Sequence, residues 1–159
     1  MSTTIDIRLP DGAIKQMPSG STPFEVAQSI SEGLARAVIS ASYNGTTIEA
    51  TTPLQEDGEL VLYTWKNDEG KKAFWHSSAH LLAQALEQMY PGIKLTIGPA
   101  IDSGFYYDID PGEHNISEKD LPAIEKRMIE LARGKHAFAL RSVAKAEALS
   151  FYKKAGNEY

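Results

Sequence analysis

The chain has 159 residues, of which 42% are hydrophobic and 23% are charged, and it contains no cysteine. This composition is typical of a folded globular protein, and it excludes disulfide bonds and thiolate metal ligands within these residues. No apolar run approaches the ~20 residues needed to cross a bilayer, and the first residues lack the apolar stretch of a signal peptide. We therefore expect a cytoplasmic protein with no membrane partner.

The net charge of −5 is unevenly distributed along the chain. Seven basic and 16 acidic residues precede Lys119, whereas nine basic and five acidic residues occur from Lys119 onward. The acidic balance excludes a uniformly basic nucleic-acid-binding surface. The basic C-terminal part could still meet a phosphate backbone, and a solvated helix face explains the same residues equally well.

The first segment predicts a β-hairpin followed by a helix. Residues 5–9 alternate apolar and polar side chains, "PDG" is a turn signal, and "AIKQM" supplies the return strand. Ser21 or Thr22 is then predicted to cap a helix that has Pro23 at its first position. The expected apolar stripe of this helix consists of Phe24, Ala27 and Ile30.

Further strands are predicted before Trp65. Asn44-Gly45 separates two strand patterns, which is a strong hairpin signal, and Asp57-Gly58 is predicted to form the turn before one more strand. The order of hairpin, helix and strands is typical of a ubiquitin-like β-grasp unit. We expect this domain to occupy residues 1–65, followed by a linker or helix start at residues 66–70.

Residues 71–159 predict a second, α+β domain. A helix containing two histidines ends at Pro91-Gly92, and "IKLTIG" and "GFYYDID" read as strands. The next helix follows a capping-box spacing at Ser117 and Asp120, where Pro122 predicts a kink or a late start. "AFALRSV" reads as a strand, and the last helix has Gly156 as its C-cap. The sheet of this domain is expected to have an open edge, as in a piece of a longer protein.

His76 and His80 are the candidate functional residues of the first helix in this domain. Helical geometry places them with Ala83 and Glu87, nearly opposite the predicted apolar face, and small alanines beside them leave room for another group to approach. A solvated pair is the simpler interpretation of this spacing. A metal site would need a third or fourth ligand, which the spacing of the other two histidines does not supply. Acid–base chemistry by imidazole near neutral pH is the remaining possibility.

The second dense stretch is "IGPAIDSGFYYDID". In a strand, Tyr106 and Tyr107 point to opposite faces, so that one packs in the core while the other offers a hydroxyl to a pocket. The alternative is an amphipathic strand that leads out of a Gly-Pro turn. Residue chemistry alone favours the amphipathic strand.

Residues 76–110, "HSSAHLLAQALEQMYPGIKLTIGPAIDSGFYYDID", closely resemble the start of the editing domain of bacterial threonyl-tRNA synthetases. The preceding "LPDGAIKQMPSGSTPFEVAQSI" and the segment up to Thr64 resemble the TGS domain that opens the same enzymes, and "IEKRMIEL" matches a later helix of the family. The resemblance covers nearly the whole chain, in order. It implies a TGS β-grasp domain followed by the first part of an editing domain, here incomplete.

The resemblance implies hydrolysis of serine from mischarged Ser-tRNA(Thr) in the parent enzyme, which ligates threonine to tRNA(Thr) using ATP. His76, His80 and Tyr107 match the family's catalytic editing residues. A lysine just beyond Tyr159 and a later Cys-x-x-x-His segment complete the family's site, so this stretch alone is expected to lack most editing activity and all aminoacylation. Ser78 departs from the small residue, often cysteine, that the family pattern leads us to expect.

The implied partner is the acceptor end of tRNA(Thr), in a parent enzyme that is a homodimer. Zinc, ATP and Mg²⁺ belong to a catalytic domain outside these residues, and no cofactor is expected here. A different class of function is an RNA- or nucleotide-responsive regulatory module, since TGS domains occur in such proteins too. The absence of a phosphate-binding G-x-x-x-x-G-K-S/T loop disfavours it.

Overall fold

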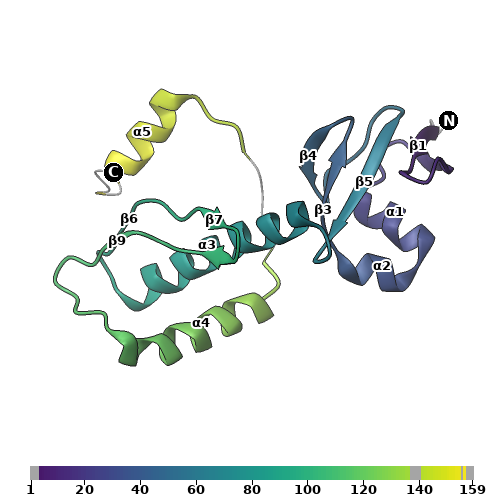
Figure 1. The fold of residues 1–159 in the computed structure, drawn as a ribbon. Helices are drawn as coiled ribbons and strands as arrows, with labels where there is room; N and C mark the ends of the chain where they lie inside the picture. Colours follow the sequence, from purple (N-terminus) through teal and green to yellow (C-terminus); the bar gives the residue numbers. More distant parts are fainter. Residues whose placement is uncertain (1–3, 137–140, 155, 157–159) are drawn as a thin grey trace. The chain divides into compact units, whose positions relative to one another are not determined.

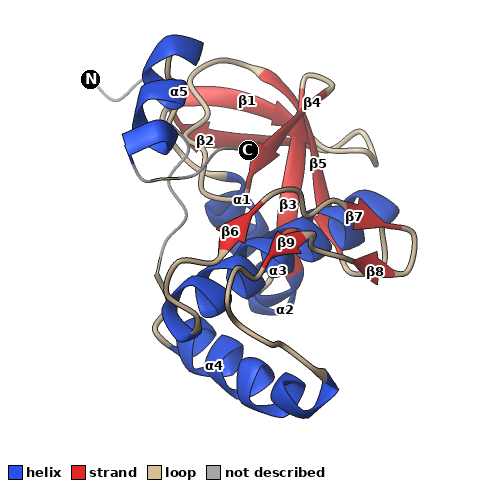
Figure 2. Ribbon diagram, turned by 90° about the vertical axis from the view of Figure 1, so that its left-hand side faces the viewer, coloured by secondary structure: helices blue, strands red, loops and turns tan. Residues whose placement is uncertain are grey.

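A computed structural model describes residues 4–136, 141–154 and 156, as drawn in Figure 1. The chain divides into two compact units, Met1–Phe74 and Trp75–Tyr159. The strands of regular length lie in the first unit, whereas helices and short strand pairs make up the second. Figure 2 shows this difference in secondary structure by colour.

The first unit contains a five-stranded mixed sheet with the order β2-β1-β5-β3-β4. Its elements are β1 (Thr4–Arg8), β2 (Ile14–Pro18), α1 (Pro23–Ile30), α2 (Glu32–Ala37), β3 (Val38–Tyr43), β4 (Thr46–Glu49) and β5 (Gly58–Thr64). The neighbours β1 and β5 run parallel, and the other pairs are antiparallel. This arrangement is the expected β-grasp architecture.

Alternation along the strands places one face of this sheet in the core. Ile5 and Ile7 of β1 are buried, while their neighbours in the strand are exposed. These two side chains pack with Val26 of α1 and with Leu60 of β5 in one buried cluster. The cluster explains why α1 lies against this face of the sheet, since burial of apolar side chains is the dominant favourable term in folding.

The predicted cap of α1 is confirmed, but the predicted apolar stripe is correct only at Ala27. Thr22 accepts a hydrogen bond from the Glu25 amide, and the Glu25 carboxylate accepts one from the Thr22 amide, which completes a capping box. Phe24 and Ile30 are each 42% exposed, whereas Val26 is fully buried. The short helix meets the sheet through Pro23, Val26 and Ala27, so its buried face is rotated away from the predicted one.

Of the two turns predicted in this unit, the one at Asn44-Gly45 is formed and the one at Asp57-Gly58 is not. Asn44 and Gly45 both have positive φ, 50° and 80°, and join β3 to β4 as the Asn-Gly signal indicates. The turn predicted at Asp57-Gly58 is not formed, because Gly58 is already the first residue of β5. The Asp57 carboxylate instead accepts a hydrogen bond from the Asp6 amide, beside the parallel pairing of β1 with β5. Helix α2 was not predicted.

Helix α3 (Asp68–Met89) begins in the first unit, and its part from Trp75 onward belongs to the second. The second unit continues with β6 (Lys94–Leu95), β7 (Ala100–Ile101), β8 (Gly104–Phe105), β9 (Ile109–Asp110), the 3₁₀ turn Glu118–Asp120, α4 (Leu121–Arg133) and α5 (Lys145–Lys154). Its core consists of Leu86, Ile93 and Ile124 with partly buried neighbours from α3, α4 and the strands. Figures 1 and 2 show α4 and the strand pairs on different sides of α3.

The strands of the second unit are shorter than the sequence predicted. β6 pairs with β9 and β7 pairs with β8, each over two residues, within one long hairpin of residues 94–110. The late helix start at Pro122 is confirmed, because the 3₁₀ turn precedes α4 and the proline lies in its first turn. The predicted strand at 137–143 falls partly outside the described residues, and residues 141–143 are not in a strand.

Candidate functional site on helix α3

The two histidines of α3 are in contact on an exposed part of the helix. Their spacing of four residues brings the rings one above the other on one helical face. The Nε2 atoms of His76 and His80 lie 3.1 Å apart, and the ring centroids lie 4.5 Å apart with the planes at 83°. Both side chains are exposed. The pair is therefore a solvent-accessible group and not a buried core contact.

The contact between the two rings restricts their protonation. A hydrogen bond between two Nε2 atoms needs one donor and one acceptor, so at least one ring is neutral while the contact lasts. Partial burial, and then the charge of His76, lower the pKa of His80 below the ordinary value of 6.5. At neutral pH the pair therefore offers an uncharged imidazole, which can accept a proton from water or hold a water molecule in place.

The alanines beside the pair are not open to an approaching group, as the sequence had suggested. Ala79 is 1% exposed and Ala83 is 7% exposed. Ala83 lies on the side of α3 that the helical pattern places with the histidines, so this side is covered as well as the predicted apolar face. The histidines thus border a packed surface. Glu87, on the same side, is exposed.

Tyr107 lies in the hairpin, between β8 and β9. Its ring is partly buried, whereas Tyr106 is 48% exposed, as expected for neighbours on opposite faces. Burial first, and then the charges of Glu87 and Tyr152, raise the pKa of the Tyr107 hydroxyl. The phenol is therefore neutral at physiological pH and is available as a hydrogen-bond donor.

Glu87 lies on the histidine side of α3, and its charge acts on the Tyr107 hydroxyl. Eleven residues of helix bring Glu87 to within about 20° of His76 around the axis, and seven residues carry it about 10 Å beyond His80. The structure brings His76 and His80 together, and the charge of Glu87 acts on the Tyr107 hydroxyl. Sequence reasoning had placed Glu87 on this side without giving it a role.

Gly98 is a further residue of this region that sequence reasoning missed. A Cβ atom at position 98 would lie 2.2 Å from Cδ2 of Tyr107, so the ring rests directly on the glycine backbone. The available signal was a glycine within a strand pattern, which often marks the close approach of another group.

The described residues contain no group of three or more His, Cys, Asp or Glu side chains that could hold a metal ion. The Nε2 atom of His114 donates a 2.8 Å hydrogen bond to the Pro91 carbonyl oxygen. His136 is an exposed residue after α4. The histidine pair alone falls short of the three protein ligands of a catalytic zinc site.

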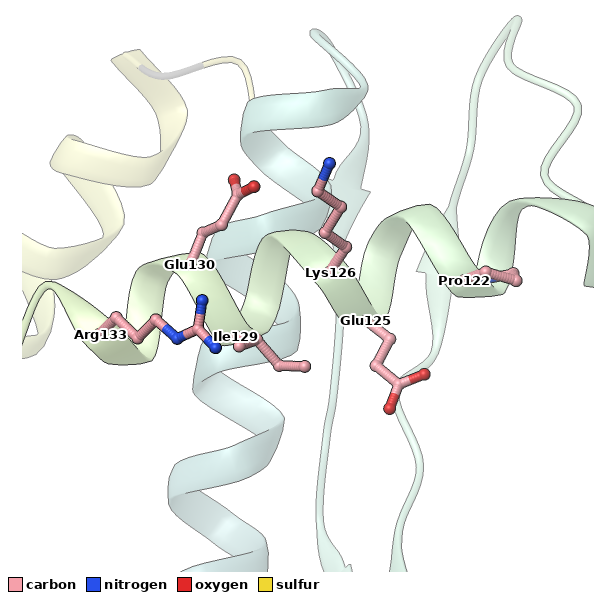
Figure 3. A pocket seen from close by; sticks show the side chains of 6 residues that line it. All are labelled: Pro122, Glu125, Lys126, Ile129, Glu130 and Arg133. Atoms are coloured by element: carbon pink, nitrogen blue, oxygen red, sulfur yellow. The ribbon is translucent and has the colours of Figure 1, made fainter.

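A shallow hollow lies along α4, away from the predicted site residues. Figure 3 shows that all of its lining side chains project from this one helix: Pro122, Glu125, Lys126, Ile129, Glu130 and Arg133. The lining carries two carboxylates and two cations, so it has no dominant charge. Neither histidine of α3 nor Tyr107 contributes to it.

Comparison with known proteins adds the family to this geometry. Residues 5–64 match the TGS domain family. These residues are a TGS domain. The chain is also 63% identical over 149 residues to the threonine--tRNA ligase of Flavobacterium johnsoniae, and that match covers 94% of the chain and 23% of the relative. The threonine--tRNA ligases of Flavobacterium psychrophilum and Phocaeicola vulgatus are 59% and 50% identical over 155 residues, covering 98% of the chain and 24% of each relative.

These matches confirm the resemblance to threonyl-tRNA synthetases. The chain is related to the N-terminal region of threonine--tRNA ligases. It spans about a quarter of the length of the curated relatives it matches. Among the described helices, none has the length and apolar character that a membrane crossing requires.

Proposed function

We propose that this chain forms the N-terminal part of a threonine--tRNA ligase and that its second unit contributes to a site that hydrolyses Ser-tRNA(Thr). The observation that carries the proposal is the contact between His76 and His80 on the exposed side of α3. It occurs in a chain that is 63% identical to a threonine--tRNA ligase. In this proposal the complete enzyme ligates threonine to tRNA(Thr) with ATP and Mg²⁺ and holds zinc in another domain.

A hydrolytic site meets a physical need of such an enzyme. Serine carries the hydroxyl group of threonine but lacks its methyl group. One missing methyl is worth only ~1–3 kcal/mol of discrimination at a single binding site. A synthetic site that accepts threonine therefore also accepts some serine, and a second site that hydrolyses the wrong ester restores accuracy.

The histidine pair is suited to positioning the attacking water. In the reaction, the oxygen of water bonds to the carbonyl carbon of the seryl ester, and the bond from that carbon to the ribose oxygen breaks. The proton lost by water ends on the ribose oxygen, and serine and tRNA leave. A neutral imidazole of His76 or His80 accepts a hydrogen bond from water or from the ribose hydroxyl beside the ester.

Tyr107 supplies a neutral hydroxyl to the same side of α3. Its raised pKa keeps the phenol protonated, so it donates a hydrogen bond and adds no negative charge near the ester. We propose that residues following this chain in the complete enzyme, among them the lysine and the Cys-x-x-x-His segment of the family, complete the site.

Binding of tRNA belongs to the same proposal. Lys126, Arg133, Lys153 and Lys154 are exposed and lie in the basic C-terminal part of the chain. Contacts between such residues and phosphates weaken steeply as salt rises. We propose that they meet the acceptor arm of tRNA(Thr), in a cytoplasmic enzyme that acts as a homodimer.

Hydrolysis of Ser-tRNA(Thr) by the full-length enzyme and by the 159-residue chain tests this proposal, with Thr-tRNA(Thr) as the specificity control. We expect the full-length enzyme to release serine and to spare threonine, and the 159-residue chain to release neither above the buffer rate. Release of serine by the short chain would contradict the composite site. Failure of both proteins would contradict the editing function, and salt-dependent tRNA binding in that case would indicate a binding module.

A further inference from the structure

The hairpin of residues 94–110 holds Tyr107 across from Gly98. The Thr96 amide donates to the Asp108 carbonyl oxygen at 3.1 Å, and the Asp108 amide donates to the Ile97 carbonyl oxygen at 2.8 Å. The Thr96 hydroxyl adds a 2.7 Å bond to the same Asp108 oxygen. These bonds fix the register of the two hairpin arms, so Tyr107 and Gly98 face each other as a consequence of backbone pairing.

The ring of Tyr107 occupies the space that a side chain at position 98 would need. A Cβ atom built on Gly98 would lie 2.2 Å from Cδ2, 2.4 Å from Cε2 and 3.0 Å from Cγ of Tyr107. Gly98 is not among the glycines with positive φ. Its backbone conformation is therefore open to other residues, and the close approach of the ring is what requires a glycine there.

We propose that Gly98 is a positioning residue for the hydrolytic site, because it lets the Tyr107 ring lie against the bare backbone of the hairpin. This inference rests on the proposed function. The bare backbone of Gly98 leaves the ring of Tyr107 its place in the hairpin. Any Cβ at position 98 moves the ring, and the phenolic hydroxyl moves with it.

The geometry can be tested on the 159-residue chain without any reaction. A proton above an aromatic ring resonates upfield, so the Hα protons of Gly98 are expected to shift upfield in an NMR spectrum. Tyr107→Leu should remove this shift while leaving the amide spectrum of the first unit unchanged. Hα protons of Gly98 at ordinary positions, unaffected by Tyr107→Leu, would overturn the proposal and leave the editing function untouched.

The role in hydrolysis is tested by a double-mutant cycle in the full-length enzyme. Gly98→Ala is expected to lower the rate of Ser-tRNA(Thr) hydrolysis by roughly 10- to 100-fold, the effect of a displacement near 1 Å in a catalytic site. Tyr107→Ala should lower it at least as much, and Gly98→Ala should then add less than about a twofold change, because no ring remains to be displaced. Gly33→Ala is the matched control, since its Cβ would meet only Ser31 Oγ, at 3.9 Å.

The outcomes separate the positioning role from a general effect on folding. If Gly98→Ala lowers the rate of hydrolysis by the same factor in the wild type and in Tyr107→Ala, positioning through Tyr107 is overturned, because a structural defect does not depend on the ring. Full activity of Tyr107→Ala would overturn the role of Tyr107 and that of Gly98 with it. A wild-type enzyme that releases no serine would overturn the proposed function itself, and the NMR result would still report the geometry.

Discussion

The two units of this chain stabilise their folds in different ways. The first has a five-stranded sheet, and four residues of its core, Ile7, Val26, Ala41 and Leu60, are fully buried. The second has strands of two residues each and a smaller buried core, while Leu149 and Phe151 are 60% and 65% exposed. All four histidines of the chain lie in the second unit.

This difference separates the larger closed core of the chain from its exposed titratable pair. The apolar residues of the TGS domain pack in a closed core, and its strands pair over most of their length. The second unit keeps a titratable pair on the surface of α3 and a partly buried tyrosine in a short-stranded hairpin. Elements that do chemistry are commonly drawn from the less stable parts of a protein, because they must remain accessible.

The largest effect is expected from removing core volume in the first unit. Leu60→Ala should lower the free energy of unfolding of this unit by about 2–5 kcal/mol, since the side chain is fully buried. Leu86→Ala should cost the second unit less, because its smaller core is free to relax around the gap. Urea unfolding followed by amide NMR signals of each unit measures both values.

Leu149→Ala, at an exposed site, is the control and should change stability by less than about 0.5 kcal/mol. A larger cost for Leu86→Ala would contradict the comparison.

A smaller effect is expected at the two helix starts that use the same capping device. Thr22→Ala should cost the first unit about 1 kcal/mol, because it removes the acceptor of the Glu25 amide. Ser117→Ala should cost the second unit less, since the capping box of Ser117 and Asp120 is exposed and precedes a 3₁₀ turn. Thermal unfolding of both variants against the wild type measures the difference. An equal or larger loss from Ser117→Ala would show that capping matters as much in the second unit.

The smallest expected effect is the pH dependence of stability, which should differ between the two units. The pKa of His80 is lowered in the folded state, so the unfolded chain binds more protons as the pH falls through 6.5. Stability of the second unit should therefore fall between pH 7.5 and pH 5.5, modestly because the ring is largely exposed, and that of the first unit should not follow a histidine titration. Urea midpoints at both pH values test this, with His80→Gln expected to flatten the slope. A slope that His80→Gln leaves unchanged would assign the effect elsewhere.

The sequence predicted the β-grasp unit well, because its signals are local. The Asn44-Gly45 turn, the Thr22 cap and the alternation of β1 each depend on neighbouring residues, and each is confirmed. The buried face of α1 was predicted correctly only at Ala27, since an eight-residue helix meets the sheet at an angle that tertiary packing sets. Helix α2 is too short for periodicity to show.

At the candidate site, the sequence predicted the contact that depends on local spacing and missed those that depend on tertiary packing. Contact between His76 and His80 follows from helical spacing, and the structure has it. The burial of Ala79 and Ala83 depends on tertiary packing, which the helical pattern of α3 does not report. The fit of Tyr107 on Gly98 depends on the register of the two hairpin arms, and the glycine within a strand pattern was its one local signal. The roles of the three site residues in hydrolysis stay predictions.

The central claim is that the contact between His76 and His80 serves hydrolysis and not stability. The most direct test is Ser-tRNA(Thr) hydrolysis by the full-length enzyme carrying His76→Ala or His80→Ala, with Gln84→Ala, an exposed position of the same helix, as the control. We expect a loss of at least roughly 100-fold for either histidine variant, with unchanged unfolding and unchanged charging with threonine, and normal hydrolysis by the control. Hydrolysis within threefold of the wild type in both histidine variants would contradict it.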